Sequence, residues 1–184
     1  MLRFLRLLGV TMALTVQVAA CQTADLHFAN RACRLAFSYP ADWEVVSDTV
    51  GSDTPCSFSL RPRAWQQLLL AHDSVDLYSI LLRGYPNEVW SQASQNGFEH
   101  HDSGWVALGW QGAEAPADTV HGPGWHGVRG MPTAGCYKVQ GPYFGLCDTP
   151  TAVVGTRTWA VVLVGGPQSE DVFDRVLATL RLGP

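Results

Sequence analysis

Four histidines are the side chains whose type best suits metal binding. His100 and His101 are adjacent, and His121 and His126 follow about twenty residues later. Imidazole nitrogen is a common ligand of zinc and copper. The spacing matches no established metal motif, however, and adjacent residues on a strand point to opposite faces. A metal-binding protein is therefore one alternative, and a set of polar loop side chains is the other.

Carboxylates in the same stretch could support hydrolysis. They are Glu99, Asp102, Glu114 and Asp118. A pair of carboxylates can cleave a glycoside when the two groups lie about 5–9 Å apart in a cleft. The chain has neither the Gly-x-Ser-x-Gly nor the Ser-x-x-Lys pattern of serine nucleophiles. A hydrolase remains a further alternative, but without a recognised constellation we expect neither an enzyme nor a cofactor.

Tryptophan is abundant, with seven residues. Trp105, Trp110 and Trp125 lie on either side of a glycine-rich segment, and Tyr143 follows further along. Large rigid aromatic side chains in such segments are useful contact residues at interfaces. We therefore expect these four to form a binding surface. The alternative is that they cover the edge of a sheet, since tryptophan is usually mostly buried.

Four of the five cysteines are expected to form two disulfides. Cys33 and Cys56 fall in phase with alternating apolar residues, so both are expected to face the core and to bridge neighbouring strands. Cys136 and Cys147 flank Gly141-Pro142, where a hairpin turn would bring them face to face on the solvent side. Four cysteines allow three pairings, of which we favour this sequential one. Two bridges indicate an oxidising compartment.

The first twenty residues have the features of an export signal. Arg3 and Arg6 precede an uncharged apolar run over residues 7–18, which is too short to span a membrane comfortably. The run ends in Val18-Ala19-Ala20-Cys21, which resembles a bacterial lipobox. That resemblance implies cleavage before Cys21 and lipid on its thiol, and Gln22 then implies sorting to the outer membrane. The alternative is an ordinary signal cleaved near Ala20, which gives a soluble periplasmic or secreted protein.

The pattern predicts one α/β domain over residues 32–184, after a signal (1–20) and a tether (21–31). We expect a loop over 111–124, since that segment is rich in Gly, Ala, Pro and Asp. Ser169 is expected to cap a closing amphipathic helix. Strands are expected over residues 33–39, 56–61, 77–82, 105–110, 125–129 and 159–164, and a short helix over 88–96.

Both ends of this domain resemble the PsbP-like fold, named for an extrinsic subunit of photosystem II. The resemblance rests on Phe37-x-Tyr39-Pro40-x-x-Trp43 at the start, and on the strand after Trp159 and the helix carrying Phe173 at the end. It implies a central, mostly antiparallel sheet flanked by helices, an α/β/α sandwich. It also implies a binding or accessory protein, since the family has no shared catalytic residue.

Charge excludes one class of partner. The chain has a net charge of −4 and a single lysine, whereas a protein that tracks nucleic-acid phosphates needs a dense basic face. We therefore expect no nucleic-acid partner.

Taken with the export signal and the lipobox, the sequence predicts a protein of the cell envelope, held at the membrane by lipid on Cys21. We expect it to bind a periplasmic protein, for example as an immunity or inhibitor factor, and a small ligand or a glycan is the alternative.

Overall fold

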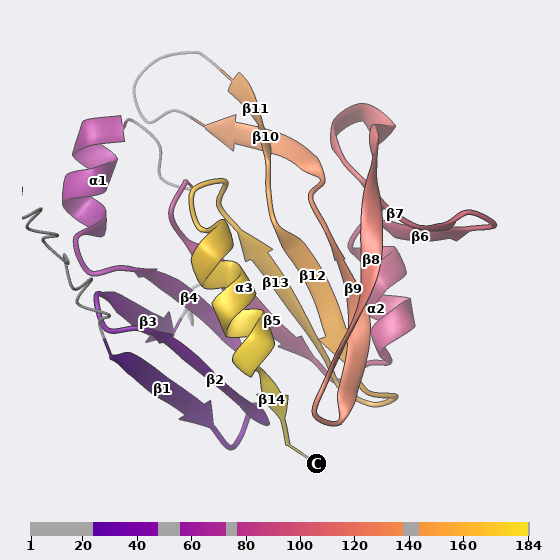
Figure 1. Ribbon diagram of the computed structural model, residues 1–184, viewed down its shortest axis with the longest axis horizontal. Helices are drawn as coiled ribbons and strands as arrows, with labels where there is room; N and C mark the ends of the chain where they lie inside the picture. Colours follow the sequence, from indigo (N-terminus) through magenta and orange to yellow (C-terminus); the bar gives the residue numbers. More distant parts are fainter. Residues whose placement is uncertain (1–23, 48–55, 73–76, 138–143, 184) are drawn as a thin grey trace, which may run out of the picture.

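The computed structural model describes residues 24–47, 56–72, 77–137 and 144–183 (Figure 1). Within these residues, the helices and strands lie between Asp25 and Leu182. Among these helices, none combines the length and the hydropathy needed to cross a membrane.

Nine strands form the main sheet, and every pairing between them is antiparallel. From one edge to the other they are β3 (Trp43–Ser47), β4 (Ser57–Pro62), β5 (Ile80–Tyr85), β13 (Ala160–Gly165), β12 (Thr151–Gly155), β9 (Trp125–Gly130), β8 (Glu114–Gly122), β7 (Gly104–Leu108) and β6 (Phe98–His101).

The strand β13 lies between β5 and β12, and its apolar sequence explains this central place. Val161 and Leu163 point into one hydrophobic core, and Ala160 and Val162 point into a second core on the other face. A strand that is buried on both faces needs apolar residues at every position. The predicted central strand is therefore confirmed.

Two smaller sheets complete the β structure. A three-stranded sheet, here called the small sheet, has the order β1-β2-β14, and β10 and β11 form a separate hairpin. The bounds of these strands are β1 (Asp25–Asn30), β2 (Leu35–Pro40), β14 (Arg181–Leu182), β10 (Thr133–Tyr137) and β11 (Phe144–Asp148). The helices are α1 (Trp65–His72), α2 (Val89–Gln95), the 3-10 turn η1 (Trp110–Gly112) and α3 (Glu170–Thr179).

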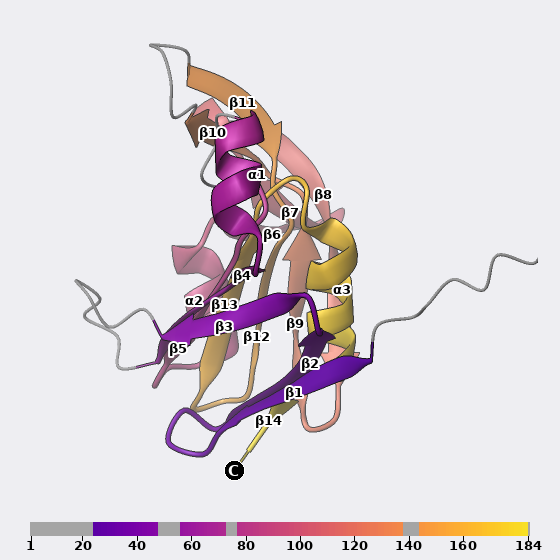
Figure 2. The ribbon, with the colours of Figure 1, turned by 90° about the vertical axis from the view of Figure 1, so that its left-hand side faces the viewer.

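The structure has less helix packed on its main sheet than the expected α/β/α sandwich. One core lies between the main sheet, the small sheet and α3, and the other lies under α2 alone. Figure 2 shows the small sheet and α3 on one side of the main sheet and α2 on the other. The expected antiparallel sheet is present, but a second sheet takes the place of much of one expected helical layer.

Two segments that were expected to lack structure form strands. Residues 25–30 of the predicted tether are β1, which pairs along its whole length with β2. Residues 114–122 of the predicted loop are β8, which pairs with both β7 and β9. The strands β8 and β9 form a hairpin whose tight turn consists of Pro123 and Gly124. Gly124 has a φ of 79°. Glycine is suited to this left-handed conformation, and proline to the position before it.

Ser169 precedes α3 as expected, but its hydroxyl does not cap the helix. The side chain is fully buried, and its Oγ donates a hydrogen bond of 2.8 Å to the carbonyl oxygen of Gly166. Arg129 instead contacts the first turns of α3, with ion pairs to Glu170 and Asp174. The helix is thus held to β9 by charge and to the core by its apolar face.

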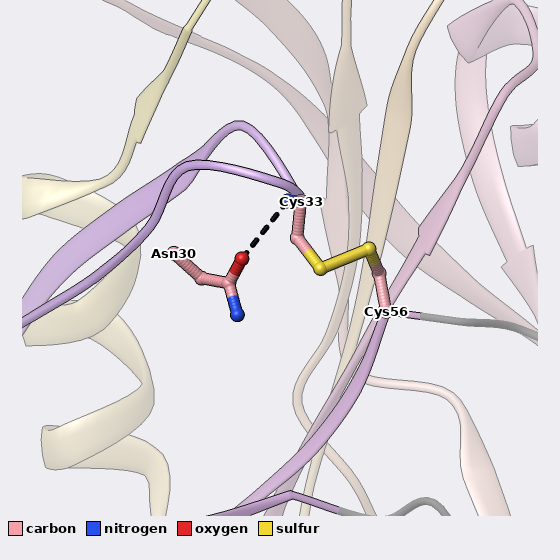
Figure 3. The surroundings of a disulfide bond; sticks show 3 residues. All are labelled: Asn30, Cys33 and Cys56. Carbon is pink, nitrogen blue, oxygen red and sulfur yellow. Dashed lines mark hydrogen bonds between the residues drawn. A yellow bond between two sulfur atoms is a disulfide. The ribbon is translucent and has the colours of Figure 1, made fainter.

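The expected disulfide between Cys33 and Cys56 is present, with the two Cα atoms 5.6 Å apart (Figure 3). Both cysteines are buried, as their phase predicted. The expectation that they bridge neighbouring strands is wrong. Cys33 lies in the turn before β2 of the small sheet, and Cys56 immediately precedes β4 of the main sheet. The bond therefore joins the two sheets.

Cys147 is also disulfide-bonded. In the β10–β11 hairpin, Cys136 lies opposite Gly145 and Cys147 lies opposite Ala134. The two cysteines are therefore diagonal neighbours, shifted from the direct opposition that a turn centred between residues 141 and 142 would give. The pairing of Cys136 with Cys147 stays a prediction.

Candidate functional site

Four aromatic rings form a continuous line across the α2 side of the main sheet. Trp90 stacks on Trp105 with ring centroids 5.2 Å apart and an interplanar angle of 16°. His126 lies against the other side of this pair, 5.1 Å from Trp90, and His100 lies edge-on to Trp105 at 5.1 Å. These four residues are called the aromatic row below. His100 is exposed and the other three are half-buried.

Three separate elements hold the aromatic row in place. Trp105 and His100 are direct partners in the β6–β7 hairpin, so register alone brings their rings together. His126 is the second residue of β9. Trp90 comes from α2, where the neighbouring Val89 is fully buried in the core. Because successive helical residues are rotated by about 100°, Trp90 leaves that buried face and lies over the hairpin instead.

The start of α2 is fixed by a local cap. The carboxylate of Glu88 accepts a hydrogen bond of 2.9 Å from the backbone N–H of Ser91. Val89 and Ala93, four residues apart, are both fully buried against the sheet. This anchoring sets the position of Trp90 and makes the ring pair a rigid feature of the surface. Stacked rings of this kind contribute about 0.5–1.5 kcal/mol beyond the area that they bury.

The composition of the row resembles that of a contact surface. Half-exposed indole and imidazole rings present flat apolar area together with ring N–H donors, which is the character of contact residues at protein interfaces. Trp90, Trp105 and His126 keep part of their surface in water. A partner that covered them would remove that surface from water without reordering flexible side chains.

Of the four aromatic residues that were expected to form a binding surface, one lies in this row. Trp105 belongs to it. Trp110 is 46% exposed but lies in η1, beyond the opposite end of β7 from Trp105. Trp125 is only 5% exposed and packs into the core, so it is not available as a surface contact. Tyr143 lies outside the described residues.

Trp90 was not among the aromatic residues expected at the binding surface. The feature of the sequence that could have identified Trp90 is its position directly after Val89, which is buried. A helical residue one step from a buried position points about 100° away from it, toward a flank of the helix. A large aromatic residue on such a flank contacts whatever lies beside the helix.

The structure does not bring the four histidines into one metal site. His121 and His126 are cross-strand partners in the β8–β9 hairpin, whereas His101 contacts the carboxylate of Glu99 at 3.3 Å. His100 and His126 lie at opposite ends of the aromatic row, with two tryptophans between them. Over the described residues, no three side chains among His, Cys, Asp and Glu are grouped to hold a metal ion.

The candidate carboxylates are likewise spread over the surface. Glu99 lies in β6, Asp102 in the following turn, and Glu114 and Asp118 in β8. All four are exposed. They lie in or beside the outer strands of the main sheet, and none of them lines the cavity at the small sheet or the cavity between β13 and β10.

No family model and no curated protein matches the chain. Two solved structures are similar in fold. The solution structure of cyanobacterial PsbP (CyanoP) from Synechocystis sp. is 11% identical, with a TM-score of 0.47, and the match covers 95% of this chain and 98% of that one. A crystal structure from Bacteroides thetaiotaomicron is 14% identical, with a TM-score of 0.42 over 89% of this chain. The chain spans about half the length of the Bacteroides chain (49%).

The PsbP structure is a member of the family that the two ends of the sequence resemble. Both TM-scores lie below 0.5, so the similarity is a loose one of fold.

Proposed function

We propose that this chain is a non-enzymatic binding module of the bacterial cell envelope. In this proposal, lipid on Cys21 holds the domain at the membrane, and the aromatic row binds a periplasmic protein. The single observation that carries the binding proposal is the stacked pair of Trp90 and Trp105, which is half-buried and flanked by two histidine rings. The Cys33–Cys56 disulfide supports an oxidising compartment such as the periplasm.

The anchor proposal is supported by the short distance along the chain between the lipobox cysteine and the fold. Cys21 precedes the first residue of β1, Asp25, by four positions. Four extended residues reach at most about 14 Å. Acyl chains contribute roughly 0.8 kcal/mol per buried methylene, so a lipidated Cys21 would hold the domain directly beside the bilayer. Such a tether raises the local concentration of the module for any partner at the same membrane.

Replacing Cys21 with serine is expected to remove the protein from the membrane fraction. The wild-type chain should sediment with membranes and incorporate labelled palmitate, because the thiol is the site of acylation. The Cys21→Ser chain should incorporate none and should no longer sediment with membranes. Thr23→Ala, two residues away, is the matched control and should behave as wild type. Membrane retention of Cys21→Ser without label would contradict the anchor.

Trp90→Ala combined with Trp105→Ala is expected to weaken partner binding by about 30-fold or more. A hot-spot residue contributes at least about 2 kcal/mol, and a factor of ten in Kd corresponds to 1.4 kcal/mol. Because the contributions of two stacked residues do not add, one such contribution, about 30-fold, is the lower limit for the pair. The oxidised domain, residues 22–184, serves as bait for an envelope extract. The captured protein is then titrated against wild-type and variant domains.

The control for this experiment is Trp110→Ala, which removes an exposed indole outside the aromatic row. Its affinity for the captured protein should match that of the wild type. Circular dichroism and thermal unfolding establish that each variant is folded before its affinity is measured. Equal affinities for the double variant and the wild type would exclude the aromatic row as the binding surface.

A further inference from the structure

Three arginines surround a trough on the small sheet, where the strands β1, β2 and β14 meet. The cavity has a volume of about 460 Å³. Arg31 and Arg34 come from the turn between β1 and β2, Arg181 comes from β14, and Ala29 and Ala36 lie between them. These five residues are called the arginine trough. None of the described residues that line it is acidic.

Ala29, Ala36 and Arg181 share the outer face of the small sheet, whereas Leu35 and Leu182, which also line the cavity, belong to its core face. Ala36 is the direct partner of both Ala29 and Arg181, and residues opposite each other in an antiparallel pair share a face. Leu35 and Phe37, on either side of Ala36, are buried in the core, so Ala36 points away from it. The two alanine side chains are short, and Arg181 extends from the same face beside them.

The turn that carries two of these arginines is held rigidly. Arg34 has a φ of 51°, a left-handed conformation that is uncommon outside glycine. Its carbonyl oxygen accepts a hydrogen bond of 2.9 Å from the backbone N–H of Gly183, which ties the turn to the end of β14. The side chain of Asn30 accepts a hydrogen bond from the backbone N–H of Cys33, and the disulfide of Cys33 fixes the turn to the main sheet (Figure 3).

Charge makes the arginine trough unusual in this protein. Removal of the signal, with Arg3 and Arg6, lowers the net charge from −4 to −6 and leaves ten basic residues. Arg61, Arg129 and Arg175 each pair with a carboxylate. Over the described residues, none of the three trough arginines makes an ion pair. Three positive charges gathered without a counter-charge attract an anion, and guanidinium binds phosphate through paired hydrogen bonds.

We propose that the arginine trough binds the phosphate headgroups of anionic phospholipids in the bilayer that holds the anchor. This inference rests on the proposed lipid on Cys21, because the lipid would bring the small sheet close to the bilayer. The strand that follows Cys21 is β1, and its last two residues, Ala29 and Asn30, line the trough. The four residues from Cys21 to Asp25 reach at most about 14 Å, so lipid on Cys21 keeps the bilayer surface near β1. At that distance, the outer face of the small sheet can lie flat against the bilayer. The trough then orients the domain, with the aromatic row left for its partner.

The test uses residues 22–184, which contain every helix and strand of the fold and no lipid. The oxidised protein is mixed at low ionic strength with vesicles of phosphatidylglycerol or of phosphatidylcholine, and the bound fraction is measured by sedimentation. We expect binding to the phosphatidylglycerol vesicles alone, and its loss in high salt, because screening weakens interactions between exposed charges. Inorganic phosphate in excess should compete.

The variant pair is matched for charge. Arg34→Gln with Arg181→Gln removes two trough charges and should lower the partition coefficient about 30-fold, about fivefold for each arginine. Arg83→Gln with Arg157→Gln removes two charges outside the trough and should leave partitioning within about twofold of wild type. Equal losses in the two double variants, or no binding to phosphatidylglycerol, would overturn the inference. So would phosphatidylcholine binding of equal strength.

Failure of the anchor and failure of the trough give different results. If the full chain carries no acyl group but residues 22–184 bind phosphatidylglycerol through the trough, the anchor proposal fails and the headgroup site is supported. If the full chain is acylated but the unacylated domain ignores phosphatidylglycerol, the trough proposal fails. The domain could also bind no lipid and form a dimer that depends on Arg34 and Arg181. That result would show that the trough binds a second copy of the chain, and it would overturn the lipid proposal.

Discussion

Replacing Cys33 and Cys56 with serine is expected to lower the free energy of unfolding by at least about 3 kcal/mol. The two cysteines are 23 positions apart, and closing a loop of that length in the unfolded chain accounts for about 3 kcal/mol in the chain-entropy model. Both side chains are at least 95% buried, so each serine also buries a hydroxyl, at a cost of about 1–3 kcal/mol where it finds no partner. Urea unfolding at neutral pH measures the loss.

The matched control is the double replacement Cys136→Ser with Cys147→Ser. Its predicted loop is shorter, and Cys147 is half-buried, so the expected loss is smaller. A Cys33→Ala, Cys56→Ala variant separates the loss of the bond from the burial of hydroxyls, since alanine adds no polar group. Equal losses for the two serine pairs would contradict the assignment of Cys33–Cys56 as the bond that joins the sheets through the core.

The sequence predicted elements whose burial is determined by their own residues. Val161, Val162 and Leu163 leave no polar face, so a strand covered on both sides was the only way to bury them. The closing helix has Phe173, Val176 and Leu177 at helical spacing, and all three are buried as expected. The phase of Cys33 and Cys56 likewise predicted their burial. Local pattern and tertiary environment agree in these elements.

The strand β8 could not be predicted from its own residues, because it is stabilised by its neighbours. It contains Pro116, which has no N–H for a ladder, together with glycine and aspartate. Yet residues up to Pro116 pair with β7, and residues from Ala117 onward pair with β9. The proline therefore lies where β8 changes partner. That position depends on two hairpins forming in three dimensions, and a local composition cannot show it.

The aromatic row was unpredictable for the same kind of reason. Trp90 and Trp105 are in different elements, and their stacking requires α2 to lie beside the β6–β7 hairpin. The arginine trough joins Arg34 to Arg181 across most of the chain, through the pairing of β14 with β2. Type and exposure of single residues can be inferred from sequence. Which of these residues lie together on one surface depends on contacts between strands and helices that are far apart in the chain. No local pattern in a single sequence predicts those contacts.

Trp125→Ala is expected to lower the free energy of unfolding by about 3–5 kcal/mol, the range for deleting a large aromatic side chain from a core. The indole ring lies against Gly122 across the β8–β9 hairpin, where a side chain in place of the glycine would collide with it. Its Nε1–H donates a buried hydrogen bond of 2.9 Å to the carbonyl oxygen of Leu180, which joins this hairpin to the end of α3. Thermal and urea unfolding measure the loss.

Two further variants separate the causes. Trp125→Phe keeps most of the ring but removes the donor, and should cost about 1–3 kcal/mol because the Leu180 carbonyl is left without its partner. Trp110→Ala removes an exposed tryptophan and should cost no more than about 1 kcal/mol. In the titration against the captured protein, Trp125→Phe should bind as wild type while it remains folded. A stable Trp125→Phe domain with lost affinity would instead place this residue at the binding surface, and the glycine-rich hairpin would then replace the aromatic row as the contact.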